Sequence, residues 1–338
     1  MADIDLGNEI NIIHNNVIYT PVVEEGMRLS TVRSGEPSKL TFNLEKRANA
    51  KVVFTEGDVV SFRKFGFYGF IFEITENSDS DTVSVTAYDQ LRYLKAKDTY
   101  VFTRQQPAVA FKTVCEDYEI AYQYGGFDLG MGTDCGFSAV CENVELFEVV
   151  QKIVDYVLKK TGRLCVLWDN YGELHFQPLP YKQKGIKKSE NLRLRGKLTI
   201  SDFESYSYTS SIDKDTYNRI KVIYDNDSTG RREVYIAQSS SSIDKWGVLT
   251  MTETMQKGED GKKKANALLN LYNHKTRTLE LKNVLADEAF RAGRLVAVGL
   301  QLRDIKISTY MLIEKCEHVI NHEEVLTNLT LRGGEFGG

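Results

Sequence analysis

The chain has 338 residues, of which 42% are hydrophobic, 11% aromatic and 27% charged, proportions typical of a folded globular protein. This length predicts roughly two or three domains instead of one compact core. With 43 basic and 47 acidic residues, the overall charge does not draw the chain to phosphate backbones, so we expect no sequence-specific nucleic-acid partner.

The start of the sequence, MADIDLGNEINIIHNN, lacks the basic and apolar segments of a signal peptide. No stretch approaches the roughly 20 consecutive apolar residues that span a bilayer. We therefore expect synthesis in the cytoplasm and no stable membrane insertion.

The cysteines are odd in number and widely spaced, and no two of them form a C-x-x-C pair: Cys115, Cys135, Cys141, Cys165 and Cys316. This pattern argues against a disulfide framework and against a zinc knuckle. We expect reduced, partly buried thiols.

The first ninety or so residues read as strands, because KLTFNL, GDVVSFRK, YGFIFEIT and TVSVTAY are short β-rich runs between turn residues. In TVSVTAY, Val83, Val85 and Ala87 alternate with polar or aromatic residues, the period of a strand with two unlike faces. Turn signals at 56–58 (EGD) and 76–81 (ENSDSD) separate the runs. Residues 1–95 therefore predict a small β-barrel or sandwich.

The periodicity changes at Asp89, where QLRYLKAK brings helix-forming residues. Asp is a favoured helix N-cap because its carboxylate accepts the unpaired amide hydrogens of the first turn. A capping role is favoured over a catalytic carboxylate, and both interpretations stay open on these residues alone.

Two helices are expected in residues 96–190. Residues 107–120 begin with Pro107, which suits a first helical turn. In 143–162 apolar residues recur at helical spacing, with Asn143 as N-cap, Glu145 in the first turn and Gly162 at the exit. The following run, RLCVLWDNYGELHFQPL, predicts a hairpin around DNYG. The segment is an α+β insertion that ends in YKQKGIKKSEN, a polar linker.

Strands resume from about residue 198 and continue to the C-terminus, with one helix in KKKANALLNLYNHKT. Ala265, Leu268, Leu269 and Tyr272 share a face of that helix. The fold class is mainly β with an α+β insertion, with a C-terminal β domain at 198–338. Strands near 198–225 are expected to complete the first barrel.

A catalytic constellation is not apparent. His318 and His322 in HVINHEE stand four apart, but Asn321 occupies the position where an inverted zinc-protease motif needs Glu, and the flanks predict a β-hairpin instead of a helix. The glycine-rich run GGFDLGMGTDCG lacks the G-K-[ST] ending of a phosphate loop. SSSSIDK at 239–245 has no G-x-S-x-G elbow and is expected to be a polar loop. We expect neither a bound metal nor a cofactor.

Four stretches carry a family resemblance, in the same order along roughly residues 30–331. They are GDVVSFRKFGFYGFIFEIT with TVSVTAYDQLRYLKAKDTYVF, DTYNRIKVIY at 215–224, KANALLNLY at 264–272, and LRDIKISTYMLIEKCEHVINHEEVLTNLTL. Together they resemble the late control protein D family, in particular its PBSX-type branch, the baseplate hub proteins of contractile phage tails and tail-like bacteriocins.

The resemblance implies a structural protein without enzymatic activity. It implies two tube-like β-barrel domains per subunit and a homotrimer that adapts a hexameric tail tube to a trimeric central spike. Such a ring resolves the mismatch between sixfold and threefold symmetry. The implied partners are the tube protein, the spike protein, the other baseplate (wedge) proteins and the tape measure protein. The implied location is the baseplate of a particle assembled in the bacterial cytoplasm.

The resemblance also implies positions that support the fold. Ala87, Tyr88 and Asp89 would mark the exit from the first barrel into the insertion, so that Asp89 would act as a hinge residue. The remaining positions would serve turns, tight strand packing or the return to β structure: Gly57, Asp58, Gly69, Asn218 and Lys221.

Two other classes of function stay open. A cell-wall (peptidoglycan) hydrolase associated with a tail predicts a cleft that holds a metal or a carboxyl group of perturbed pKa. A monomeric wall-binding β protein predicts an exposed aromatic platform. The sequence does not distinguish a phage from a headless bacteriocin.

Overall fold

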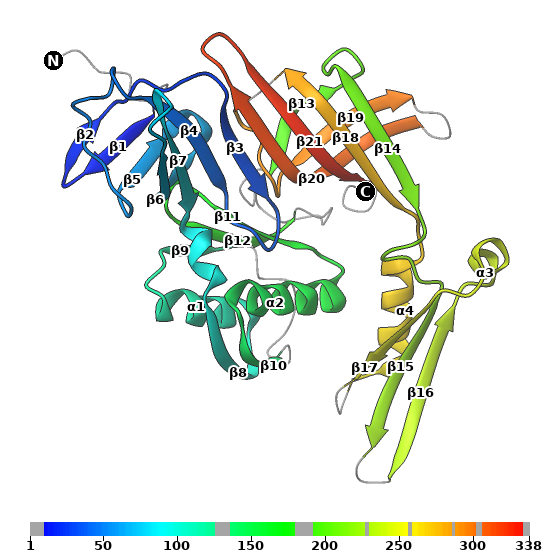
Figure 1. Cartoon of the computed structure of the whole chain (residues 1–338). Helices are drawn as coiled ribbons and strands as arrows, with labels where there is room; N and C mark the ends of the chain where they lie inside the picture. The colour runs from blue at the N-terminus through cyan, green and yellow to red at the C-terminus, as the bar shows by residue number, and fades with distance from the viewer. Residues whose placement is uncertain are drawn as a thin grey trace. The chain divides into compact units, whose positions relative to one another are not determined.

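The computed structural model describes residues 10–125, 136–179, 192–226, 230–255, 259–285, 288–301 and 306–333. It contains two compact units. Unit 1 comprises Met1–Val157, Arg163–Ser207 and Leu279–Gly338, and unit 2 comprises Leu158–Gly162 and Tyr208–Thr278. The elements are labelled along the chain in Figure 1. The domain boundaries expected from the sequence stay predictions.

A sheet of 13 strands dominates unit 1. In the order in which they pair, its main path is β14 (Ser205–Ser211), β18 (Thr276–Leu285), β21 (Val325–Gly333), β20 (Lys306–Ile320), β3 (Met27–Val32), β4 (Lys39–Glu45), β7 (Thr82–Asp89), β6 (Phe67–Glu76), β5 (Val59–Phe62), β1 (Asn11–His14) and β2 (Val17–Tyr19). A branch adds β19 (Leu295–Gln301) beside β20 and β13 (Arg193–Leu198) beside β19. Over the described residues this path is open at both ends, and the two tube-like barrels stay a prediction.

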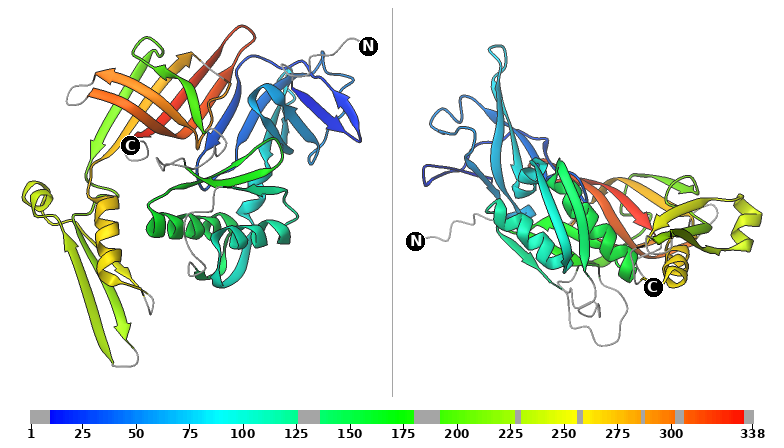
Figure 2. Two further views of the ribbon diagram at one scale, coloured as in Figure 1. Left: turned by 180° about the vertical axis from the view of Figure 1, so that it is seen from behind. Right: turned by 90° about the horizontal axis from the view of Figure 1, so that it is seen from below.

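Strand β20 joins the two ends of the chain. Its residues Lys306 to Leu312 pair with β19, and its residues Lys315 to Ile320 pair with β3. Along the other edge β20 pairs with β21, with a register shift between Ile313 and Lys315. Figure 2 shows β20 and β21, in orange and red, beside the blue strand β3. The first and last strands of the chain therefore form one continuous sheet.

The strand alternation predicted for the N-terminal residues is confirmed in β4 and only in part in β7. In β7, Val85 and Ala87 are fully buried and Ser84 is exposed, but Thr86 is also buried and Val83 is half-buried. In β4, Leu40, Phe42 and Leu44 alternate with exposed or half-buried residues. These side chains share one apolar core with residues of β1, β3, β5 and β6. Burial of such a face supplies most of the stabilisation of a β-sheet domain.

The expected insertion folds as helices packed with small sheets. Its elements are the short 3-10 helix η2 (Gln90–Lys95) at its entry, β8 (Lys97–Gln105), α1 (Pro107–Asp117), β9 (Tyr122–Tyr124), β10 (Phe137–Glu145), α2 (Leu146–Thr161), β11 (Cys165–Asp169) and β12 (Leu174–Pro178). Another 3-10 helix, η1 (Arg63–Phe65), connects β5 to β6 within the large sheet. Strands β11 and β12 form the antiparallel hairpin predicted around DNYG, and β9 lies parallel to β12. The linker expected at 181–191 lies outside the described residues.

The start of α2 differs from the prediction. Asn143 and Glu145 belong to β10 and not to a cap and a first turn, and the helix begins at Leu146. Asn143 has a φ of +49° at a register shift of β10 against β8, and its N–H donates to the Thr99 hydroxyl. The polar residue therefore serves an irregular strand. The helix itself, its buried apolar stripe and the exit at Gly162, with a φ of +69°, are confirmed.

Unit 2 is a three-stranded sheet covered on one face by a helix. Its strands are β15 (Arg219–Asn226), β16 (Arg231–Gln238) and β17 (Thr250–Thr254), and its helices are α3 (Ser240–Trp246) and α4 (Gly261–Tyr272). Ala265 and Leu268 of α4 pack with Ile220 and Val222 of β15, which confirms the predicted helix face. Asp260 caps α4, because its carboxylate accepts from the backbone N–H groups of Lys262 and Lys263.

The loop expected at 239–245 is instead the short helix α3. The serines predicted a loop because a serine side chain can form hydrogen bonds with nearby backbone groups in non-helical conformations. The helix is one short stretch that ends at Gly247, where a φ of +74° suits a residue without a side chain.

Two further expectations concern thiols and membranes. Cys115, Cys141, Cys165 and Cys316 are free and buried, as expected for reduced thiols, and Cys135 lies outside the described residues. Among the helices of the described part of the chain, none is long and apolar enough to cross a membrane.

Candidate functional site

Asp89 ends β7 and is almost completely buried, with 1% of its surface exposed. Its Oδ1 accepts hydrogen bonds from the backbone N–H of Leu91 and of Ser38, each at 3.1 Å. The predicted capping role is therefore confirmed, although the capped element is the 3-10 helix η2 and not an α-helix. The carboxyl group fixes the point at which the chain leaves the large sheet.

Asp169 ends β11 and holds the hairpin turn that follows. Its Oδ1 accepts from the backbone N–H of Gly172 at 2.7 Å, and its carboxyl group also accepts from the backbone N–H of Gln90 in η2. In return, the Gln90 side-chain amide donates to the Gly172 carbonyl oxygen. The β11–β12 hairpin is thereby attached to η2, next to Asp89.

The two carboxyl groups line one cavity of about 40 Å³. The Oδ2 atoms of Asp89 and Asp169 are buried and have no hydrogen-bond partner among the described residues. Burial raises the pKa of Asp89 well above its usual range, and the nearby charge of Asp169 raises it further, while hydrogen bonds from Ser38 and Leu91 oppose the shift. Burial also raises the pKa of Asp169, to about 7. Sequence reasoning selected Asp89 and missed Asp169.

Gly57 and Asp58 form the turn expected at 56–58. Gly57 has a φ of +89°, a conformation that favours glycine, and its N–H donates to the Ile71 carbonyl. The Asp58 carboxylate accepts from the Thr55 N–H at 2.7 Å and lies 2.8 Å from His14 Nδ1. The turn thus leads into β5 and contacts β6.

Gly69, Ala87 and Tyr88 lie together where β6 pairs with β7. A Cβ atom on Gly69 would lie 2.2 Å from the Tyr88 carbonyl oxygen, so only glycine fits this contact. Ala87 is fully buried and pairs with Ile71 of β6 and Leu40 of β4. The large sheet brings these residues and Asp89 together, with the turn at Gly57 and Asp58 beside them.

Asn218 and Lys221 lie in unit 2. Asn218 is fully buried, its Nδ2 donates to the Gly247 carbonyl at 2.7 Å, and its Oδ1 accepts from the Leu249 N–H at 2.8 Å. It therefore ties β15 to the chain between α3 and β17. Lys221 is half-buried in β15, opposite Ile236 and Thr252.

A row of aromatic rings, which sequence reasoning missed, crosses the face of β6 opposite the core. Tyr68, Phe70 and Phe72 alternate with the buried residues Phe67, Gly69 and Ile71. Neighbouring ring centroids along the row Tyr171, Tyr68, Phe70, Tyr93, Phe72, Tyr88 are 5.3, 6.2, 6.0, 6.2 and 5.6 Å apart. The alternation of aromatic residues in YGFIF is the sequence signal for it.

Three cationic side chains lie over this aromatic row. Arg63 lies over Tyr171 at 5.2 Å, Arg92 over Phe72 at 5.2 Å and Lys39 over Tyr88 at 5.9 Å, each measured to the ring centroid. These distances suit cation–π attraction. Tyr93 is 41% exposed, and the other rings of the row are half-buried.

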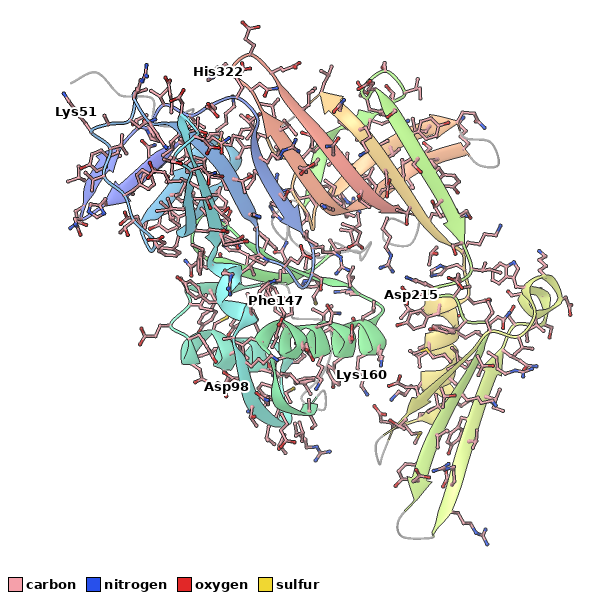
Figure 3. The ribbon with its side chains drawn as sticks, viewed as in Figure 1. Lys51, Asp98, Phe147, Lys160, Asp215 and His322 are labelled. Atoms are coloured by element: carbon pink, nitrogen blue, oxygen red, sulfur yellow. The ribbon has the colours of Figure 1, made fainter. Side chains whose placement is uncertain are left out.

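The two histidines of HVINHEE do not face one another. His318 is buried in β20, with Nδ1 2.8 Å from the Thr327 hydroxyl and Nε2 2.8 Å from the Phe290 carbonyl oxygen. His322 lies exposed in the turn between β20 and β21 (Figure 3). The predicted β-hairpin is confirmed. Over the described residues, no group of three or more His, Cys, Asp or Glu side chains could hold a metal ion.

The fold is that of phage tail proteins. It is similar to a tail protein from Neisseria meningitidis MC58, with a TM-score of 0.66 and 11% identity over 98% of both chains. It is also similar to prophage tail protein gp18 from Listeria monocytogenes EGD-e, with a TM-score of 0.62 and 15% identity over 97% of this chain and 95% of the other. The fold is also similar to the Escherichia coli c3393 protein, with a TM-score of 0.51 and 11% identity over 98% of this chain and 79% of the other. The c3393 protein is a component of the type VI secretion system that is described as structurally similar to the T4 bacteriophage tail proteins gp27 and gp5.

Sequence relatives give the family. The chain is 26% identical to the Bacillus subtilis phage-like element PBSX protein XkdQ over 275 residues, or 79% of each chain. It is 26% identical to the B. subtilis protein YqbQ over 243 residues, which cover 70% of this chain and 69% of YqbQ. The sequence profile of the YQBQ-like family matches residues 27–332, and the chain belongs to this family.

Gly69→Ala tests the close contact between β6 and β7. The added methyl group would meet the Tyr88 carbonyl oxygen, so β6 must shift, and overpacking of this kind typically costs about 1–3 kcal/mol. Urea denaturation measures the loss. Gly125→Ala is the matched control, because Gly125 has open space around its Cβ position and no positive φ. Equal stability of the two variants would contradict the close contact.

Asn218→Ala tests the tie within unit 2. The change leaves the Gly247 carbonyl and the Leu249 N–H without their side-chain partner, at a cost of about 1–3 kcal/mol for each group that stays buried. Hydrogen exchange read by mass spectrometry should show faster exchange of the Leu249 amide. Lys221→Ala, in the strand β15 that Asn218 precedes, is the control. Equal protection of Leu249 in both variants would count against the tie.

Proposed function

We propose that the protein is a structural baseplate hub of a contractile phage tail or tail-like bacteriocin, of the late control protein D type. In this proposal the protein forms a homotrimer that adapts the hexameric tail tube to the trimeric central spike. Each subunit contributes two tube-like β modules, so that three subunits present six to the tube. The particle is a virion or a tail-like particle.

The observation that carries this proposal is the likeness to tail proteins, one of them from a prophage, over nearly the whole chain. A likeness restricted to one small β domain would fit many functions, because folds are shared among unrelated activities. The relative XkdQ is a protein of a phage-like element, and the c3393 protein is described as similar to T4 tail proteins gp27 and gp5. Both descriptions favour a part of the tail machinery.

The continuous sheet of unit 1 also suits a load-bearing joint. The hub must keep tube and spike connected during contraction, and the β20 pairing with β3 links the first and last strands through backbone hydrogen bonds. Its partners in this proposal are the tube protein, the spike protein, the wedge proteins and the tape measure protein. Interfaces of permanent complexes commonly bury about 2,000 Å² or more.

The predicted positions have structural roles in the proposed hub. Gly69, Ala87, Tyr88 and Asp89 fix the exit from the large sheet, and Asp89 acts as the hinge residue between that sheet and the insertion. Gly57 and Asp58 hold the turn before β5. In unit 2, Asn218 directly precedes β15 and Lys221 lies within it. None of them acts on a substrate in this proposal.

The cavity between Asp89 and Asp169 does not favour a wall hydrolase. Sites for small molecules commonly enclose about 300–1,000 Å³, whereas this cavity measures about 40 Å³ and cannot admit a sugar ring. The raised pKa values there follow from burial at a structural joint. We therefore propose a protein without enzymatic activity.

The hub proposal predicts stoichiometric recovery of baseplate proteins. Tagged protein is purified under native conditions from its source cells after prophage induction, and the bound proteins are quantified by mass spectrometry. Tube, spike and wedge proteins should be recovered in similar amounts, and native mass of the hub–spike complex should show three copies of the chain. Recovery of none of these proteins would contradict the hub.

A second candidate function, binding of a wall glycan, is favoured by the aromatic row. Aromatic rings with nearby cations are suited to anionic sugars, since rings stack on apolar sugar faces. This alternative predicts that the protein sediments with purified peptidoglycan and that Tyr93→Ala releases it. Tyr206→Ala is the matched control, because Tyr206 is 45% exposed and Tyr93 is 41% exposed. Absence of sedimentation, or equal loss in both variants, rejects glycan binding through the row.

A further inference from the structure

The sheet of unit 2 has one covered face and one open face. On the covered face, Ile220 and Val222 of β15 pack with residues of α4, which lies along the strands (Figure 1). Successive side chains of a strand point to opposite faces, so the residues that alternate with these lie on the other face. There, Val234 and Ile236 of β16 are 48% and 56% exposed. This second face is called the open face.

The apolar side chains of the open face are neighbours. Ile223 of β15 is paired directly with Val234 of β16, and Ile236 is the next residue of β16 on the same face, paired with Lys221. Scattered apolar residues are ordinary on a protein surface, whereas these three form one patch. Exposed threonines of β17 continue the face beside β15: Thr250, Thr252 and Thr254.

The open face carries uncompensated positive charge. Arg232 and Asp225 compensate one another, because Nε of Arg232 donates to Oδ1 of Asp225 at 2.6 Å. The Nε of Arg219 donates to the Gln238 side-chain oxygen at 2.9 Å, and this amide is neutral. Lys221 forms no ion pair with another residue of the described part of the chain. Two cationic side chains therefore adjoin the apolar patch, and charge complementarity favours an acidic partner.

The dimensions of the open face match one α-helix. Neighbouring strands lie about 4.8 Å apart, so the outer strands of a three-stranded sheet are about 10 Å apart, close to the diameter of a helix. From Arg219 to Asp225, β15 rises about 20 Å, which is the length of a helix of about 13 residues. The helix α4, with 12 residues, covers the other face. Strands β15 and β17 are parallel, and parallel pairing occurs mainly in sheets with both faces covered.

We propose that the open face is a docking site for an acidic amphipathic helix of a partner protein. The apolar stripe of that helix covers Ile223, Val234 and Ile236, and its carboxylates lie beside Lys221 and Arg219. The sheet then carries a helix on each face. Unit 2 alone provides this surface, whether or not the chain acts as a hub.

The first test measures the binding of a synthetic acidic helix to the full chain. The probe is a fluorescent peptide of about 15 residues, long enough to form a helix, with leucines at helical spacing and glutamates elsewhere. Fluorescence anisotropy should show saturable binding that weakens as the salt concentration rises. A peptide with lysines in place of the glutamates should bind at least about tenfold more weakly.

Substitutions on the open face should weaken binding of the acidic peptide. Lys221→Glu should reduce the affinity about tenfold, because it replaces attraction by repulsion. Lys262→Glu makes the same change of charge at an exposed residue of α4 and should keep the wild-type affinity. Val234→Thr should reduce the affinity about fivefold, because a hydroxyl group replaces a methyl group that the helix buries. Val101→Thr is the matched control in β8, where Val101 is 65% exposed.

The second test identifies the occupant in source cells. A photo-crosslinking amino acid in place of Ile236 should crosslink to a partner segment that has acidic residues and apolar residues at helical spacing. Crosslinks to a second copy of this chain, or to a segment without that pattern, assign another occupant and overturn the proposal. It is also overturned if the acidic peptide does not bind saturably, or if the open-face variants bind it as tightly as their controls.

Discussion

The pairing of β20 with β3 is the interaction on which the rest of unit 1 depends. Six residues of β20, Lys315 to Ile320, lie in register with the six residues of β3. Backbone hydrogen bonds continue past both ends, from Arg33 N–H to the Glu314 carbonyl and from Gly26 N–H to the Ile320 carbonyl. The Arg33 guanidinium also contacts the Glu314 carboxylate at 2.5 Å. Without this pairing, the N-terminal strands would expose the edge of β3 and lose the packing of Ile320 against their core.

The insertion depends on that sheet in turn. It leaves the sheet at Asp89 and returns to it through the β11–β12 hairpin, whose turn is held by Asp169 and Gln90. Strand, 3-10 helix and hairpin therefore meet at one point, and the aromatic row covers the same point on the opposite face of β6. In the proposed hub, such short hydrogen-bonded attachments would suit force transmission, since long flexible links would absorb the displacement.

Local sequence signals predicted the elements that have a strong period of their own. The alternation in TVSVTAY, the apolar stripe of 146–157 and the turn residues of DNYG each carry enough information within one short window, and β7, α2 and the β11–β12 hairpin are found there. The N-cap prediction for Asn143 was wrong because any Asn that precedes an apolar stripe has the sequence pattern of a helix N-cap. Here the residue bends a strand at a position that only the pairing of β10 with β8 defines. The loop prediction at 239–245 was wrong for a related reason, because serine residues locally favour loops and the segment folds as α3.

Of the two buried carboxyl groups in the candidate site, one could be predicted from the sequence. Asp89 carries a local signal, because the change of period places it at a strand end, whereas Asp169 acquires its role through a neighbour that is 80 residues away in sequence. The branching of β20 is likewise a tertiary property. Its run of apolar residues predicts a strand but not which strands lie beside it.

The separation of β3 and β20 along the chain sets the order in which the protein can be completed. Arg33 and Glu314 are 281 positions apart, and a ribosome adds about 5–20 residues per second. The edge of β3 therefore waits roughly 15–60 s for its partner strand after it has been synthesised. Until then β3 presents an unpaired edge that another chain could occupy. A truncated chain that ends before β20 cannot close this edge, so incomplete copies differ from finished ones in the very strand that joins the two ends of the molecule.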